Sequence, residues 1–158
     1  NILWIGFRAL GEDGYSLNGQ SEEKIKKFVE NGGVVIVSGQ DSDDGGKHIG
    51  WFAGKLKGVE AEVQTGIRPK KEAKELFKQP NEVVTDNVYT EDSWNHGGKD
   101  FDVLATTNDN RNVAIGMYKV GKGMYLITSL HHQTFFHVSS NQRLIENLIY
   151  FAAEHIRK

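Results

Sequence analysis

The feature that most constrains the fold is a pair of glycines between a helical segment and an apolar strand. Residues 21–31 have a helical pattern that ends at Gly32-Gly33, and the uninterrupted apolar residues 34–37 follow at once. A polar loop, residues 38–46, comes next. Helix, buried strand and loop in this order are typical of open α/β sheets, where ligands gather at the carboxyl ends of strands. The sequence therefore indicates where a site lies more clearly than it indicates which reaction takes place there.

Apolar spacing assigns the first half of the chain to short strands and amphipathic helices. Residues 2–7 form a predicted strand, and Ser21 is the predicted N-cap of a helix. The apolar side chains Ile25, Phe28 and Val29 share one face of that helix. The other elements predicted in this half are a helix over 49–56, a short strand over 59–64 and a helix over 70–78 that ends before Pro80.

The second half begins with a long polar loop, residues 81–98, which could cover a site. Three strands are predicted after it, over 101–107, 113–120 and 124–130, and the turn Gly121-Lys122-Gly123 joins the last two as a hairpin. The closing helix begins near Ser140. Its predicted buried face consists of Leu144, Ile145, Leu148, Ile149, Ala152 and Ile156.

Together these elements predict one α/β domain over residues 1–158. The expected architecture is a Rossmann- or flavodoxin-like three-layer sandwich with a mainly parallel sheet and an antiparallel C-terminal hairpin. Its 158 residues suit a single core. The chain opens directly on a strand, so the architecture predicts either a missing first βα unit or further domains of a longer chain.

Composition excludes several classes of function. The chain has 19 Lys plus Arg against 21 Asp plus Glu, so no strong field favours nucleic acid or an anionic membrane. It has no cysteine, which excludes disulfides, thiolate metal sites and a cysteine nucleophile. No apolar run approaches the roughly 20 residues that span a bilayer, and we expect a soluble domain. The compartment is not indicated.

The order of these motifs resembles the ThuA-like branch of the class I glutamine amidotransferase-like, flavodoxin-related superfamily. The resemblance covers nearly the whole chain, and its most distinctive part is the Gly-Lys-Gly turn followed by a strand and a histidine. It rests on residues 28–33, on Trp51 and Leu56, on residues 112–116 and 118–124, on residues 128–132, and on the closing helix 143–153.

The resemblance implies functional groups above the strand ends in a family associated with sugar utilisation and often fused to other carbohydrate-related modules. Glutamine amidotransferases place a nucleophilic cysteine after the strand, and this chain has none. ThuA-like proteins often carry a histidine there, where this chain has Gly39. The second family histidine matches His132, with Gln133 where an acidic residue is common. The resemblance therefore implies a degenerate site without amidotransferase activity.

Two groups of polar residues are candidates for chemistry. Asp41, Asp43 and Asp44, with His48, could bind a divalent cation, but the spacing is not that of an EF-hand and a solvated turn is the better reading, so we predict no metal. His132 is the candidate general base, with Asp43 or Asp41 as its carboxylate partner. A histidine that only stabilises its own turn is the equal alternative.

Neighbouring residues complete the predicted site. His131 faces the other side of its strand from His132, and the aromatic rings of Trp51 and Trp94 could stack on a sugar, although aromatic clusters more often belong to a core. Tyr89, Phe135, Phe136 and His137 share these two interpretations. Ser38 lacks the Gly-x-Ser-x-Gly arrangement of a strand-to-helix nucleophile. The predicted ligand-binding residues are Gly39, Gln40, Asp41, His48, Trp51, Trp94 and His131.

Three functions stay open on the sequence alone. The first is a domain that binds a carbohydrate or small polar ligand without amidotransferase activity. The second is an active enzyme on a sugar-derived substrate that uses His132 with an Asp of the 41–44 loop. The third is a non-catalytic structural or interaction module. No cofactor is predicted, because no Gly-x-Gly-x-x-Gly follows a strand, and no nucleic-acid or membrane partner is expected.

Overall fold

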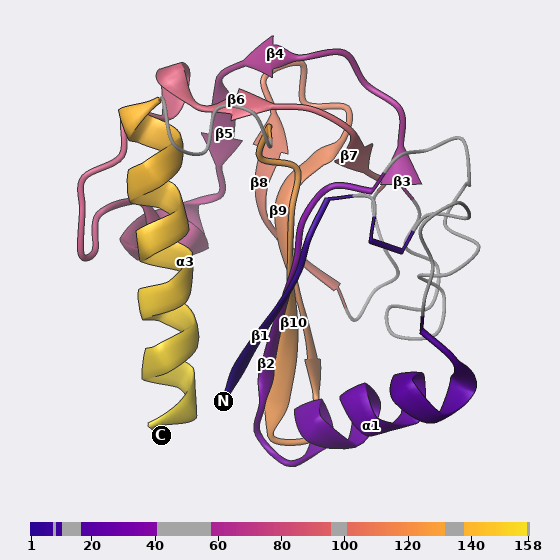
Figure 1. The fold of residues 1–158 in the computed structure, drawn as a ribbon. Coiled ribbons are helices and arrows are strands. Elements are labelled where there is room, and N and C mark those ends of the chain that lie inside the picture. The colour runs from indigo at the N-terminus through magenta and orange to yellow at the C-terminus, as the bar shows by residue number, and fades with distance from the viewer. Residues whose placement is uncertain (8, 11–16, 41–57, 96–100, 132–137, 158) are drawn as a thin grey trace.

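The structure, a computed structural model, describes residues 1–7, 9–10, 17–40, 58–95, 101–131 and 138–157. Figure 1 shows a mixed α/β fold whose sheet lies beside the long C-terminal helix. The first elements are β1 (Ile2–Ile5), α1 (Gly19–Glu30), β2 (Val34–Val37), β3 (Gly58–Val59), β4 (Gln64–Thr65) and β5 (Ile67–Pro69). After them come the 3-10 helices η2 (Lys71–Phe77) and η3 (Thr85–Asn87), the strands β6 (Tyr89–Thr90), β7 (Ser93–Trp94), β8 (Phe101–Thr107), β9 (Val113–Val120) and β10 (Gly123–Thr128), and α3 (Ser139–Ile156).

The main sheet is mixed, and most of its pairings are antiparallel. Its order is β1-β2-β10-β9-β7-β3, and β8 pairs with both β9 and β5. Only β1 with β2 and β2 with β10 are parallel among the described strands. The predicted mainly parallel sheet is therefore wrong, whereas the α/β class and the antiparallel C-terminal hairpin are confirmed. The reason is local: β8, β9 and β10 follow one another through short turns, and strands joined in this way run antiparallel.

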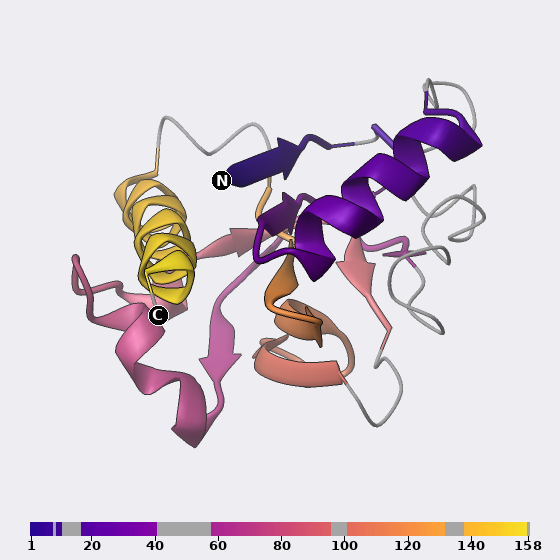
Figure 2. The same cartoon turned by 90° about the horizontal axis from the view of Figure 1, so that it is seen from below.

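Two apolar clusters cover the two faces of the sheet. Val34 and Ile36 belong to the cluster on the α3 face, whereas Val35 and Val37 belong to the cluster on the α1 face. Alternate side chains of a strand point to opposite faces, so β2 is buried from both sides. Figure 2 shows α3 and α1 on the opposite sides of the sheet that these clusters require.

Helix α1 ends as the sequence predicts and begins three residues earlier than predicted. The N-cap is Asn18, whose side-chain oxygen accepts a hydrogen bond from the Ser21 N–H at 2.9 Å, so the predicted N-cap Ser21 is wrong. At the other end Gly32 has φ +104°. The Gly33 N–H donates to the Phe28 carbonyl at 2.9 Å, which is the hydrogen bond of a Schellman motif. The glycine pair therefore stops the helix and turns the chain directly into β2.

Helix α3 buries two asparagines on its apolar face. The amide of Asn141 bonds both the N–H and the carbonyl of Tyr89 at 2.9 Å, and Asn147 donates to the Leu76 carbonyl at 2.8 Å. These side chains anchor the middle of the chain to the helix. Ile149, predicted to be buried, is 42% exposed. The other predicted positions lie on the buried side, with Leu144, Leu148 and Ala152 buried and Ile145 and Ile156 half-buried.

The middle of the chain is less regular than predicted. The predicted strand over 59–64 is replaced by the two short strands β3 and β4, and the predicted helix over 70–78 is the 3-10 helix η2. Its three predicted anchors, Ala73, Leu76 and Phe77, are buried. The predicted loop over 81–98 contains η3, β6 and β7 in its described part. Strands of two residues are too short to produce a period that the sequence could reveal. No helix within the described residues is long and apolar enough to cross a membrane.

Candidate functional site

The carboxyl ends of β1, β2 and β10 meet at one edge of the sheet because these strands are parallel. The chain leaves β2 at Ser38 and β10 at Ser129. Residues 89–94, which contain β6 and β7, cross this edge, and the His131 N–H donates to the Tyr89 carbonyl at 3.0 Å. We call this region the carboxyl edge. It lies towards the top of Figure 1 and is the place that the sequence pattern indicates.

Gly39 lies directly beneath the backbone of the crossing segment. A Cβ atom at this position would lie 2.9 Å from the Asp92 carbonyl oxygen and 3.4 Å from that of Glu91. Asp92 itself has φ +40° and its N–H donates to the Ala61 carbonyl at 3.1 Å. The Glu91 N–H donates to the Ser129 carbonyl at 2.8 Å. The missing side chain of Gly39 therefore allows residues 91 and 92 to close over the end of β2, and its predicted role as a ligand-binding residue stays a prediction.

His131 and Glu91 form a histidine–carboxylate pair at the carboxyl edge. The His131 Nε2 atom lies 3.4 Å from Glu91 Oε2, and the two side chains are 9% and 23% exposed. A carboxylate at this position orients the imidazole ring. The predicted ligand-binding residue His131 thus has a chemical partner, although its ligand role stays a prediction.

Gln40 holds together the loops that leave β1 and β2. Its Oε1 atom accepts from the Leu10 N–H at 2.8 Å, and its Nε2 atom donates to the carbonyls of Gly6 at 3.0 Å and Ser38 at 2.7 Å. Both hydrogens of the amide group are therefore used, and the residue is 3% exposed. The structure shows Gln40 as a brace of the carboxyl edge, and its predicted contact with a ligand stays a prediction.

Two tryptophans bind the strand ends from opposite faces. Trp94 is fully buried, and its indole N–H donates to the Thr128 carbonyl at 3.0 Å. The indole N–H of Trp4 donates to the Ser38 hydroxyl at 2.8 Å. Trp94 belongs to the core on the α1 face. The ring therefore lies where the core interpretation of the aromatic residues predicts. Its stacking on a ligand stays a prediction.

Three hydroxyl groups are buried around the crossing segment. They belong to Thr90, Ser93 and Thr128, and none has a hydrogen-bond partner within the described part of the chain. Thr90 forms an isolated β-bridge with Leu130, next to His131. A buried hydroxyl without a partner costs about 1–3 kcal/mol. These hydroxyl groups make the interior of the carboxyl edge more polar than the apolar clusters next to it.

Several predicted residues lie outside the described residues. The predicted catalytic pair His132 and Asp43 is among them, so the geometric test of that pair stays open. The others are Asp41, Asp44, His48 and Trp51 of the acidic loop and of the predicted ligand-binding group, and Phe135, Phe136 and His137 of the aromatic group. Within the described ranges no group of three His, Cys, Asp or Glu side chains could hold a metal ion.

Sequence reasoning missed Glu91 and Asp92. Both residues lie in residues 81–98, which the sequence predicts to be a polar loop able to cover a site. The unusual length of this loop was the only signal that pointed to them. Their partners Gly39 and His131 are far away along the chain, so no local pattern connects them. From the sequence alone, two adjacent acidic residues in a polar loop are expected to be exposed to solvent.

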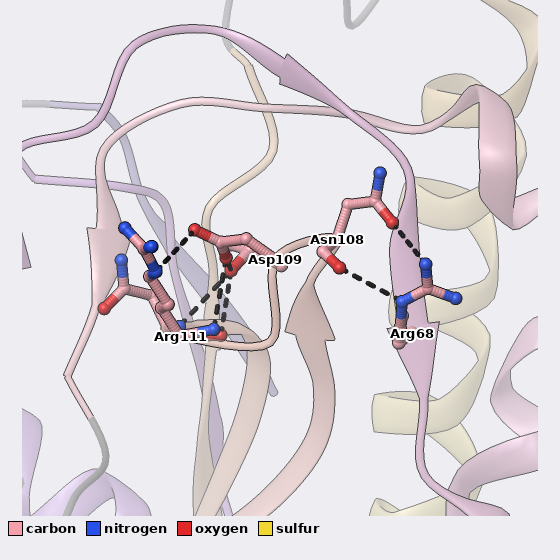
Figure 3. Close-up of polar contacts among 6 residues, drawn as sticks. Arg68, Asn108, Asp109 and Arg111 are labelled. Carbon is pink, nitrogen blue, oxygen red and sulfur yellow. Dashed lines mark hydrogen bonds and ion pairs between the residues drawn. The ribbon is translucent and has the colours of Figure 1, made fainter.

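A second polar cluster lies where β8 turns into β9, and Figure 3 shows its side chains. Arg68 of β5 donates from Nε to the Asn108 carbonyl at 3.0 Å and from a terminal nitrogen to the Asn108 side-chain oxygen at 2.7 Å. The Asp109 carboxylate accepts from the Thr107 hydroxyl at 2.6 Å and from the Arg111 N–H at 3.1 Å. The hydrogen bond from Thr107 has the largest effect on the pKa of Asp109 and the one from Arg111 the next largest, and both lower this pKa below its ordinary value. The cluster fixes the turn.

Known protein structures of low sequence identity share this fold, among them the following three. A cytoplasmic protein from Salmonella typhimurium is 17% identical with a TM-score of 0.57, and the match covers 95% of this chain and 70% of that one. A β-galactosidase from Bacillus circulans sp. alkalophilus is 12% identical with a TM-score of 0.58, covering 97% of this chain and 22% of that one. A ThuA-like protein from Bacteroides uniformis is 13% identical with a TM-score of 0.56, covering 85% and 64%.

The sequence itself gives one family match. The family model described as the lacto-N-biose phosphorylase central domain matches residues 11–157. No curated protein matches the sequence. The chain spans about a fifth of the length of the β-galactosidase whose fold it shares.

Proposed function

Since this chain belongs to the lacto-N-biose phosphorylase central-domain family, we propose that its carboxyl edge binds a carbohydrate or a related small polar ligand. The family name and the name of the β-galactosidase with the same fold both refer to proteins that act on sugars. The fold likeness to a ThuA-like protein supports kinship with that branch, which is the finer part of the proposal. The ligand-binding role is proposed for this chain alone and not for the longer relatives.

One observation carries the proposal, namely the pairing of His131 with Glu91 at the ends of parallel strands. Sugar hydroxyls both donate and accept hydrogen bonds, so a site for them needs acceptors such as carboxylates and donors such as imidazole N–H groups. The buried hydroxyls of Thr90, Ser93 and Thr128 add groups of the same kind nearby. In open α/β folds this edge is also where ligands commonly bind. Chemistry and position therefore support the same site.

The proposed ligand binding does not involve amidotransferase chemistry. That reaction requires a cysteine nucleophile, and the chain has no cysteine at any position. The closing of residues 91 and 92 over Gly39 also fills the space above the end of β2 with backbone. We therefore propose a binding domain with a degenerate site.

An enzyme acting on a sugar-derived substrate is the second candidate, and the same histidine–carboxylate pair favours it. An imidazole oriented by a carboxylate can serve as a general base. In this version His131 with Glu91 would transfer the proton, in place of or beside the predicted pair His132 with Asp43. The measurement that separates the two candidates is loss of lacto-N-biose in the presence of phosphate, followed by chromatography.

Thermal unfolding with and without sugars tests the binding proposal. Lacto-N-biose and galactose are the probes, because a ligand that binds only the folded state stabilises it by about 2.7 kcal/mol at a hundred times its Kd. The test variants are His131→Gln and Glu91→Gln, which keep side-chain size. His155→Gln is the matched control, since His155 is bonded to the Lys122 carbonyl at the far end of α3.

We expect either sugar to raise the melting temperature of the wild type and of His155→Gln, and to have a much smaller effect on the other two variants. An equal rise in all four proteins would place the ligand elsewhere. No rise with either sugar in the wild type would contradict the carbohydrate part of the proposal. Turnover abolished by His131→Gln would move the conclusion to the enzyme.

A further inference from the structure

We propose that a cavity between η2, β8 and α3 is a binding site for small organic cations that carry an apolar body. The cavity has a volume of about 460 Å³, which lies within the range of roughly 300–1,000 Å³ that is typical of ligand pockets. None of its described lining residues belongs to the carboxyl edge. The inference therefore goes beyond the proposed carbohydrate site and does not depend on it.

The cavity lies where β5 leaves the sheet. Strand β5 pairs with β8 over residues 105–107 only. The Lys70 N–H then donates to the Leu104 carbonyl at 2.9 Å, and the chain continues as η2. Among the described strands, the first part of β8 therefore has β9 as its only neighbour. Helices η2 and α3, which lie next to each other in Figure 2, enclose the space beside it.

The interior of the cavity is apolar. Four of its lining residues belong to the buried cluster on the α3 face, namely Ala73, Leu76, Leu104 and Met117. The half-buried ring of Phe151, which also lines the cavity, packs against the same cluster. Removal of apolar surface from water is favourable, so these side chains offer a surface for the apolar part of a ligand.

The rim of the cavity is mainly acidic. Glu72 and Glu75 of η2 and Asp102 of β8 contribute carboxylates, whereas Lys70 is the only cationic side chain among the described lining residues. All four residues are exposed, and none of their side chains forms a hydrogen bond or an ion pair with another described residue. Three negative charges therefore stand against one positive charge, and the rim attracts a cation at the mouth of the cavity.

Asp102 is the carboxylate that the sheet itself places at the cavity. It lies opposite Met117 in the antiparallel register of β8 and β9. Residues paired in this way point to the same face of a sheet, so Asp102 points to the α3 face, where Met117 belongs to the apolar cluster. A ligand whose ammonium group pairs with Asp102 therefore places its apolar part next to Met117.

Polarity and charge together select this class of ligand. A sugar is a poor match, because the apolar interior leaves its hydroxyl groups without hydrogen-bond partners. A carboxylate or a phosphate ester is repelled by the acidic rim. An amine with an aromatic or aliphatic body satisfies both parts of the cavity, since its body is buried in the interior and its ammonium group stays at the rim.

Methyl NMR of the methionines tests the site. The chain has two methionines. Met117 lines the cavity, whereas Met124 is fully buried elsewhere and is the internal control. The probes are phenethylammonium, phenethyl alcohol and phenylacetate, which share a phenyl ring on a short chain and carry a positive charge, no charge and a negative charge. We expect phenethylammonium to shift the Met117 signal and to leave the Met124 signal unchanged, with a Kd in about the millimolar range.

The charge of the probe should decide its affinity. We expect phenethyl alcohol to bind roughly fivefold more weakly than phenethylammonium, and phenylacetate to bind most weakly of the three. The difference between the first two should shrink as salt is added, because the rim carboxylates are exposed to solvent.

A pair of variants separates the rim from the overall charge of the protein. Asp102→Asn removes a rim carboxylate, and Asp86→Asn is the matched control, because Asp86 is exposed on η3 and is not among the lining residues. We expect Asp102→Asn to weaken phenethylammonium roughly two- to fivefold and to leave phenethyl alcohol unchanged. Asp86→Asn should change neither affinity. Far-ultraviolet circular dichroism checks that both variants are folded.

Two kinds of result would overturn the proposal. Equal affinities of phenethylammonium and phenethyl alcohol, or equal effects of the two variants, would overturn the assignment to organic cations. A Met117 signal that responds to none of the probes, or a Met124 signal that shifts as much as that of Met117, would overturn the site itself. Neither result bears on the response to sugars, which is tested with changes at His131 and Glu91.

Discussion

The two ends of the central sheet both bring backbones into close contact through glycine, yet they differ in what surrounds the contact. At the amino end, a Cβ on Gly121 would lie 2.6 Å from the Glu30 carbonyl oxygen, and the Lys122 N–H donates to that same oxygen at 3.1 Å. At the carboxyl edge, Gly39 lies beneath Asp92 at a similar separation. Backbone hydrogen bonds close both ends, but at the carboxyl edge the contact lies beside a histidine–carboxylate pair, His131 with Glu91.

This difference teaches that glycine marks close approach but not function. The amino-end turn needs glycine for its shape as well, since Gly121 has φ +58° at the first of two turn residues between β9 and β10. No carboxylate–histidine pair accompanies it among the described residues. At the carboxyl edge, His131 and Glu91 lie next to the crossing segment. The polar residues near a glycine contact, and not the contact itself, identify a candidate site.

The largest expected effect is at the amino end. A Cβ on Gly123 would overlap the carbonyl oxygens of both Gly33 and Val29, and neither backbone can move without breaking the α1–β10 packing. We expect Gly123→Ala to lower the free energy of unfolding by about 3 kcal/mol or more, measured in urea. Gly19→Ala is the control, because an added Cβ there meets nothing within 4 Å. A loss no greater than that of the control would contradict the rigid closure of this end.

The corresponding change at the carboxyl edge should cost less. In Gly39→Ala the added Cβ meets backbone at 2.9 Å on one side only, so residues 91 and 92 can shift away. We expect a loss of about 2 kcal/mol in the free energy of unfolding, measured in the same urea titration. Because the shift carries Glu91 away from His131, the response to sugars should fall as well. A larger loss than that of Gly123→Ala would reverse the comparison.

The side-chain closure of the carboxyl edge is tested by Trp94→Phe. Phenylalanine fills most of the buried space but cannot donate to the Thr128 carbonyl, which Trp94 bonds at 3.0 Å. We expect a loss of about 1–2 kcal/mol in the free energy of unfolding, from the unpaired carbonyl and the smaller ring. Chemical denaturation followed by circular dichroism provides the measurement. An unchanged midpoint would show that another donor replaces the indole.

The smallest effect concerns pH and the turn between β8 and β9. Because the pKa of Asp109 is below its ordinary value of 3.8 in the folded state, its carboxylate stabilises the fold fully above that value. The contribution is lost as the pH falls through the lowered pKa. In Asp109→Asn the difference in melting temperature from the wild type should therefore shrink below about pH 4. A constant difference across the acid range would mean that the charge has no role.

The sequence predicted the parts of the fold that depend on neighbouring residues. The apolar run of β2, the hairpin of β9 and β10, and the glycine stop of α1 are each determined within a few positions, and all three are confirmed. The antiparallel majority of the sheet was missed, because the pairing of β8 with β9 through their short turn was not predicted and the short strands β3 and β7 carry no period. Asn141 and Glu91 were also missed, since their partners come from distant segments.

The order of the strands has a kinetic consequence. Strands β8, β9 and β10 follow one another directly, and β9 pairs with both of its sequence neighbours, so this meander closes only short loops. Strand β2 reaches β10 only after the whole middle of the chain has been bridged, as in the pairing of Val34 with Met124. Short loops close sooner than long ones. The antiparallel half should therefore form first and act as a template on which the parallel half, and with it the carboxyl edge, is assembled last.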